Sequence, residues 1–165
     1  MKDFKVLLVD DEQEFIETLS ERLAMRDMDA KLALDGEQAL EAVQDDEPDV
    51  ILLDLKMPGM DGMEVLRRIK KAYSHVQVVM LTGHGTEKDE EQALRLGAYA
   101  YLQKPVDLER LVTTLKDAFK NKARKFESSM MAATFAEAGD VKTAREIMDK
   151  EEDPLGTKKK KRGKK

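Results

Sequence analysis

Five short apolar runs alternate with helix-like stretches along residues 1–120, and this alternation limits the fold more than any other feature. The runs are Lys5–Val9, Ala30–Leu34, Val50–Asp54, Gln77–Leu81 and Ala100–Gln103. Short β-forming runs bounded by turn residues are typical of buried parallel strands. Parallel strands need crossover connections, and each gap here is long enough to hold a helix. The pattern predicts an α/β fold: a five-stranded parallel, doubly wound sheet with helices on both faces.

The stretches between the runs have the spacing of amphipathic helices. Phe15, Leu19 and Leu23 share one face of the first stretch, and Gly97 follows the fourth stretch as a left-handed cap. The helices are expected at about residues 14–26, 37–44, 63–72 and 87–96, and from Asp107 onward.

Polar residues stand where four of the predicted strands end. Asp10 and Asp11 follow the first strand, Asp54 ends the third, Thr82 follows the fourth and Lys104 follows the fifth. The carboxyl ends of strands in an open parallel sheet face one crevice, where ligands bind. Three carboxylates, a hydroxyl and an ammonium therefore share a small space. This set suits a divalent cation together with a phosphoryl group.

The carboxylates have a chemical reason to bind a cation, because clustered carboxylates without one raise one another's pKa values. Mg²⁺ prefers oxygen ligands and commonly uses one or two protein carboxylates, which Asp11 and Asp54 can supply. By strand alternation Asp10 is expected to point away, unless the chain has already turned, and to reach the metal through a water. Each aspartate alone has a simpler role as a helix N-cap or turn residue, and only their joint placement favours a site.

An aspartate beside Mg²⁺ is a competent nucleophile toward phosphorus, and we expect Asp54 to take a phosphoryl group as an acyl phosphate. Thr82 would donate a hydrogen bond to one phosphoryl oxygen, and Lys104 would pair with another. Aspartate-nucleophile phosphatases, which share this chemistry, usually carry a second acid two residues after the nucleophile to protonate the leaving group, and this chain has Lys56 there. We therefore expect a phosphoacceptor with at most slow self-dephosphorylation and not an enzyme.

Composition narrows the class of protein further. The chain has no cysteine, which excludes disulfides and thiol catalysis, and only His75 and His84 offer imidazole ligands. The sequence contains neither a signal-peptide core nor an apolar run of about 18 residues. A cytoplasmic protein without a transmembrane segment is expected.

The chain divides into three predicted parts. We expect a phosphoacceptor domain at 1–122, a helical extension or hairpin at 123–150 and a disordered lysine-rich tail at 151–165. The pattern from Phe135 to Met148 resembles half of a tetratricopeptide-type hairpin, although a single copy favours an ordinary hairpin.

Charge is distributed unevenly between the body and the C-terminal region. Residues 1–120 have 16 basic and 26 acidic residues, a net charge of −10, whereas residues 121–165 have 13 and 8, a net charge of +5. An acidic body with a basic tip is the resulting layout.

Several segments together resemble the receiver domains of bacterial two-component response regulators. They occur in order over about residues 4–120, and the ordered set is far more specific than any one motif. The segments are Leu7–Glu12 (LLVDDE), Asp54–Gly62 (DLKMPGMDG), Leu81–Gly83 (LTG), and Gly97-Ala98 followed by Tyr101 and Lys104-Pro105.

The resemblance implies a flavodoxin-like fold with strand order 2-1-3-4-5 and a role for each residue of the site. Asp54 would be the phosphoacceptor, with Asp10 and Asp11 as the acidic pair. Asp11, Asp54 and the backbone carbonyl of Lys56 would bind Mg²⁺, with Asp10 acting through a water.

The resemblance also implies a switch and partners. Thr82, Lys104 and Tyr101 would be the switch residues, with the Tyr101 ring following Thr82 inward on phosphorylation. The phosphodonor would be a histidine kinase or a histidine phosphotransfer protein. The surface formed by residues 87–96, the strand at 100–103 and the following helix would then bind a downstream protein partner. A phosphorylation-dependent homodimer is a further possibility.

Three residues of the site have roles that the sequence leaves open. Tyr101 has the alternative of ordinary packing at the sheet edge. Lys56 and His84 stand two residues after Asp54 and Thr82, and the resemblance implies that they flank an attacking water and tune the lifetime of the phosphate. His84 has the alternative of an exposed loop residue.

The region after residue 120 is too short for a winged helix or a cyclase domain, so no dedicated DNA-binding domain is expected. The leading hypothesis is a stand-alone response regulator in a two-component or phosphorelay pathway. The alternative is a phosphorylation-regulated nucleic-acid or membrane-surface binder that acts through Lys158–Lys165. That tail lacks interleaved aromatics and an amphipathic pattern, which is typical of a solvated tail.

Overall fold

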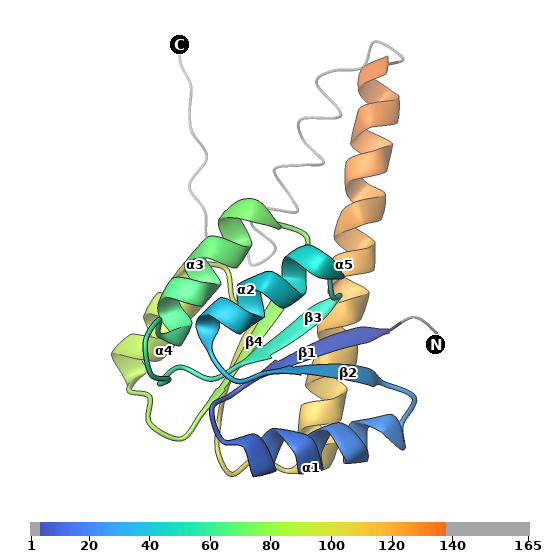
Figure 1. The fold of residues 1–165 in the computed structure, drawn as a ribbon. Coiled ribbons are helices and arrows are strands. Elements are labelled where there is room, and N and C mark those ends of the chain that lie inside the picture. Colours follow the sequence, from blue (N-terminus) through green and yellow to red (C-terminus); the bar gives the residue numbers. More distant parts are fainter. Residues whose placement is uncertain (1–3, 138–165) are drawn as a thin grey trace. The chain divides into compact units, whose positions relative to one another are not determined.

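A five-stranded parallel sheet with helices on both faces forms the body of the protein (Figure 1). The computed structural model describes residues 4–137. The strand order is β2-β1-β3-β4-β5, which confirms the predicted fold class and the implied order. The elements are β1 (Lys5–Val9), α1 (Gln13–Ala24), β2 (Asp29–Ala33), α2 (Gly36–Asp45), β3 (Val50–Leu53), α3 (Gly62–Ala72), β4 (Gln77–Thr82), α4 (Glu87–Arg95), β5 (Ala100–Gln103) and α5 (Leu108–Glu137).

The register of the strands brings their carboxyl ends to one edge of the sheet. Val9 at the end of β1 pairs with Leu53 at the end of β3, so the residues that follow them leave the sheet side by side. Thr82 at the end of β4 pairs with Gln103 at the end of β5. The sheet thus assembles the predicted site from four strands.

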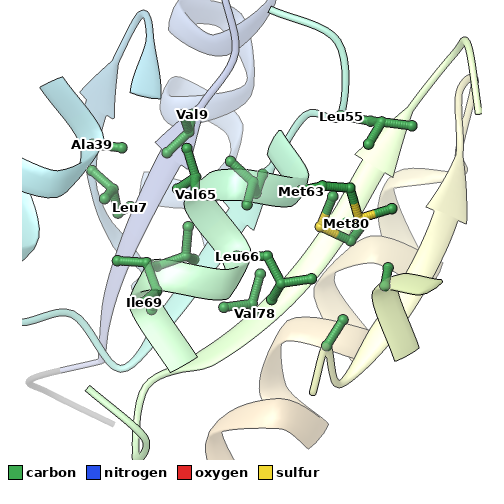
Figure 2. Packing of buried hydrophobic residues seen from close by; sticks show 14 of the residues in the cluster. Leu7, Val9, Ala39, Leu55, Met63, Val65, Leu66, Ile69, Val78 and Met80 are labelled. Carbon is green, nitrogen blue, oxygen red and sulfur yellow. The ribbon is translucent and has the colours of Figure 1, made fainter. Parts of the chain in front are cut away.

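Alternation along the strands divides the core into two clusters, one on each face of the sheet. Leu7 and Val9 point to the face that α2, α3 and α4 cover, and Figure 2 shows the α3 side chains Val65 and Ile69 packed in this cluster. Val6 and Leu8 point to the opposite face, where the core is completed by α1 and α5.

The helix ends follow from local side-chain chemistry. Asp35, Asp61 and Thr86 are N-caps whose side chains accept hydrogen bonds from the backbone of α2, α3 and α4, respectively. Gly97 has φ 110°, which confirms the left-handed turn predicted after α4. Glu12 at the start of α1 makes no such cap.

Helix α1 ends at Ala24, two residues before the predicted end. Asp27 has φ 63°, and the backbone N–H of Met28 donates to the carbonyl of Leu23 at 3.1 Å, which closes the helix in a Schellman-like turn. Met28 is only 1% exposed. Burial of this side chain explains the early turn, which helical periodicity does not reveal.

Helix α5 continues to Glu137 and so extends into the segment predicted as a separate extension. The chain divides into two compact units, Met1–Lys122 and Ala123–Lys165. The predicted hairpin from Phe135 to Met148 and the tail at 151–165 fall largely or wholly outside the described residues. None of the described helices is long and apolar enough to cross a membrane.

We expect Ile69→Ala to lower the free energy of unfolding by about 2–5 kcal/mol, because Ile69 on α3 is fully buried against the sheet and its truncation leaves a cavity. Urea unfolding followed by circular dichroism measures the change. Lys71→Ala, on the exposed side of the same helix, is the matched control and should stay within about 0.5 kcal/mol. Equal effects of the two substitutions would contradict the packing described here.

Candidate functional site

Three aspartates lie together at the carboxyl edge of the sheet. One oxygen each of Asp10, Asp11 and Asp54 lies within 4.8 Å of the others. Asp10 and Asp54 are 3% and 5% exposed, whereas Asp11 is exposed. Asp10 lies beyond the end of β1, where its backbone N–H still bonds Ala33 of β2, and its carboxylate joins the cluster directly. The strand ends at Val9, so the alternative left open for Asp10, that the chain has already turned, is the one that the structure shows.

The Lys104 ammonium forms an ion pair with Asp10. Its Nζ donates to Asp10 Oδ2 at 2.6 Å and to Glu12 Oε1 at 3.0 Å. Burial alone would lower the pKa of Lys104, but the hydrogen bonds to Asp10 and Glu12 outweigh burial and raise the pKa above its ordinary value. Lys104 is therefore a firmly charged ammonium beside the acidic cluster.

Contacts of the loop after β5 fix the position of Lys104. The backbone N–H of Lys104 donates to the carbonyl of Thr82 at 2.9 Å, which ties the ends of β5 and β4 together. The Lys104–Pro105 peptide bond is cis. The Nζ of Lys104 lies 4.4 Å from the ring centroid of Phe15 on α1, within range of a cation–π interaction.

Asp54 lies in an environment that disfavours its charge. Burial, and then the neighbouring charge of Asp10, raise the pKa of Asp54, while Lys104 and a hydrogen bond with Thr82 oppose the shift. Among the described residues, Asp54 Oδ1 is a buried oxygen without a hydrogen-bond partner. A buried carboxylate oxygen that no protein donor satisfies is suited to a bound cation or an incoming electrophile.

Gly62 packs directly against the backbone of Asp54. A Cβ at Gly62 would lie 2.1 Å from the carbonyl oxygen of Asp54, and the Gly62 N–H donates to the Leu55 carbonyl at 2.7 Å. Only glycine permits α3 to start this close to the loop that carries Asp54. In the sequence Gly62 only ends the Asp54–Gly62 segment, and nothing in the pattern revealed this contact.

The side chains of Thr82 and Tyr101 both lie against Gly85. Thr82 is fully buried, and its Oγ1 accepts from the backbone N–H of His84 at 3.2 Å. A Cβ on Gly85 would lie 1.5 Å from Tyr101 Oη and 3.1 Å from Thr82 Cγ2. The Tyr101 ring is therefore turned inward, with 8% of the residue exposed, over the loop that follows Thr82.

Two residues of the site were not predicted. Glu12 binds Lys104, and Phe15 lies under its ammonium. The sequence placed Glu12 merely in the first motif and Phe15 on the apolar face of a helix, and no local signal linked either to Lys104, which lies about ninety residues away in sequence. Lys56 and His84, by contrast, are exposed loop residues beside the cluster.

A crevice of acidic groups with one lysine, at the carboxyl edge of a sheet in the order 2-1-3-4-5, defines a receiver-type signalling domain. The family model of the response regulator receiver domain matches residues 6–116. This chain therefore belongs to the response regulator receiver domain family of two-component signalling. Its cluster of Asp10, Asp11 and Asp54 fits the phosphoacceptor site of such domains.

Solved structures agree with the family assignment. A response regulator receiver domain protein from Clostridium thermocellum is 32% identical with a TM-score of 0.69, and the match covers 72% of this chain and 96% of that chain. The chemotaxis protein CheY4 of Vibrio cholerae is 31% identical with a TM-score of 0.65, over 69% and 97% of the two chains. NtrX from Brucella abortus is 32% identical with a TM-score of 0.72, over 77% of this chain and 29% of that chain.

We expect Gly85→Ala to drive the Tyr101 ring out of its inward position, because the new Cβ would overlap Tyr101 Oη. NMR spectra of protein labelled with ¹³C on the tyrosine rings should show a changed Tyr101 signal. Gly83→Ala is the matched control, since the nearest atom to its Cβ would be at 3.8 Å, an ordinary contact. An unchanged Tyr101 signal in Gly85→Ala would contradict the shared space.

Asp54→Asn should raise the free energy of unfolding by about 1–2 kcal/mol near pH 7.5 in metal-free buffer, because it removes a buried charge with an unsatisfied oxygen. The folded-state pKa of Asp54 is raised, so the penalty is absent below the ordinary carboxyl pKa and complete above the raised value. The gain in the variant should thus shrink as the pH is lowered.

Urea unfolding at several pH values measures this gain. Asp11→Asn is the control, since Asp11 belongs to the same cluster but is exposed, and it should gain less. A loss of stability in Asp54→Asn at pH 7.5 would show that the Asp54 charge is well satisfied in the fold.

Proposed function

We propose that this receiver domain accepts a phosphoryl group on Asp54 from a histidine kinase or a histidine phosphotransfer protein. The observation that carries the proposal is the buried Oδ1 of Asp54, which has no hydrogen-bond partner within residues 4–137 and lies in a cluster with Asp10, Asp11 and Lys104. In the transfer, an Asp54 oxygen would form a bond to phosphorus while the bond from phosphorus to the donor histidine nitrogen breaks, leaving an acyl phosphate and an imidazole.

Mg²⁺ fits the residues of this site. The donor set is hard oxygen, and the three clustered carboxylates carry more charge than the Lys104 ammonium that binds one of them. Asp11, Asp54 and the backbone carbonyl of Lys56 would hold the ion, with Asp10 acting through a water. When bound, Mg²⁺ would neutralise the clustered charge and that of the incoming phosphoryl oxygens.

The other residues would stabilise the phosphoryl group once it is attached. The Thr82 hydroxyl would donate to one phosphoryl oxygen, and the Lys104 ammonium would pair with another. The Thr82 hydroxyl lowers the pKa of Asp54, which supports this role. Lys56 and His84 are exposed and would tune how readily water reaches the phosphate. Self-dephosphorylation would be slow.

Signalling would follow from the space that Thr82 and Tyr101 share. Movement of Thr82 toward a phosphoryl group would change the room left for the Tyr101 ring, because both side chains border Gly85. Phosphorylation would thus favour one population of ring positions. The surface of α4, β5 and α5 would carry this change to a downstream protein partner or to a second copy of the chain.

Incubation with acetyl phosphate and Mg²⁺ should add one labile phosphoryl group to the wild type, seen by intact-mass spectrometry. Asp54→Ala should abolish the adduct, because it removes the nucleophile, and chelation of Mg²⁺ should abolish it as well. Asp45→Ala, which removes an exposed aspartate at the end of α2, should leave the adduct unchanged. An adduct that persists in Asp54→Ala would assign the phosphoacceptor elsewhere.

A further inference from the structure

Glu12 occupies the N-cap of α1 without capping it. The N-caps of α2, α3 and α4 each accept a hydrogen bond from the backbone of their own helix, but Glu12 does not. Glutamate is also a poor choice for this position, which favours aspartate, asparagine, serine and threonine. The Glu12 carboxylate instead accepts from Lys104 Nζ at 3.0 Å.

The ammonium of Lys104 is fully engaged by its surroundings. It has three N–H donors, and the structure gives it Asp10 at 2.6 Å, Glu12 at 3.0 Å and the Phe15 ring centroid at 4.4 Å. Within residues 4–137, the ion pairs of Lys104 are with Asp10 and Glu12 and not with Asp54. A phosphoryl group on Asp54 can gain a direct contact with Lys104 only if one of these partners yields.

The exposed fractions of the Asp10 and Glu12 side chains indicate which of them releases Lys104 more easily. The Asp10 side chain is 4% exposed, so releasing it would leave a buried carboxylate without its counter-ion. The Glu12 side chain is 65% exposed, so its carboxylate returns to water at little cost. Phe15 offers only the weak attraction of a ring face.

We propose that Glu12 is a positioning residue. Its carboxylate holds the Lys104 ammonium away from the phosphoryl site and releases this ammonium when a phosphoryl group is attached to Asp54. The Glu12 carboxylate and the phosphoryl oxygens compete for the same ammonium, so the Glu12 pair weakens phosphoryl binding in the resting domain. This inference rests on the proposed function, because the competitor of Glu12 is a phosphoryl group on Asp54. It assigns the third residue of the Asp10-Asp11-Glu12 motif a task separate from metal binding.

The test is the affinity of the full chain for beryllofluoride, a phosphoryl mimic, measured by calorimetry at saturating Mg²⁺. Glu12→Gln removes the charge of the competitor and should tighten binding about two- to fivefold, the range expected for an exposed ion pair. Glu12→Asp keeps the charge but shortens the side chain, and aspartate can cap α1 instead. It should tighten binding to a similar extent and also raise the urea midpoint.

Glu14→Gln is the matched control, because it removes an exposed carboxylate from the same first turn of α1 and should leave the affinity unchanged. Tighter binding in Glu12→Gln alone, with Glu12→Asp like the wild type, would mean that only net charge matters and would overturn the proposal. Unchanged affinity in both Glu12 variants would overturn it as well. Failure of the wild type to bind beryllofluoride would instead reject the proposed function itself.

Discussion

Four carboxylates, those of Asp10, Asp11, Asp54 and Glu12, surround the Lys104 ammonium at the carboxyl edge of the sheet, and this excess of negative charge governs the site. The parallel register forces the encounter, because Val9 pairs with Leu53 and the next residues are Asp10 and Asp54. Lys104 reaches the cluster from the end of β5 and binds Asp10. Asp54 stays buried with a raised pKa, and one of its oxygens has no hydrogen-bond partner in the described part of the chain. The described residues therefore place more negative than positive charge around Asp54.

The fold tolerates this local cost because its apolar cores lie on both faces of the sheet. Leu8, Leu53 and Met80 are fully buried in strands directly beneath the charged edge. Burial of such side chains supplies about 1.5–3 kcal/mol each, which is comparable to the cost of one unsatisfied buried carboxylate oxygen. Burial of a few strand residues is therefore enough to offset the cost of gathering these carboxylates.

The fold was predictable from sequence because its signals are local: apolar runs, turn residues and helix caps such as Asp35 and Asp61. The convergence of Asp10, Asp54, Thr82 and Lys104 followed from the general rule for strand ends. Side-chain alternation did not give the direction of the Asp10 carboxylate, because alternation stops where the strand stops. The sequence also did not reveal the roles of Glu12, Phe15 and Gly62, which depend on contacts between segments distant in sequence.

The hydroxyl of Tyr101 is buried without a hydrogen-bond partner among the described residues. Turning inward, the ring gains about 2 kcal/mol from burial but gives up a solvated hydroxyl at a cost of about 1–3 kcal/mol. These two amounts nearly cancel, so inward and outward positions of the ring would differ little in free energy. In the proposed switch, a gap this small would let a single added hydrogen bond at Thr82 decide which position the Tyr101 ring occupies.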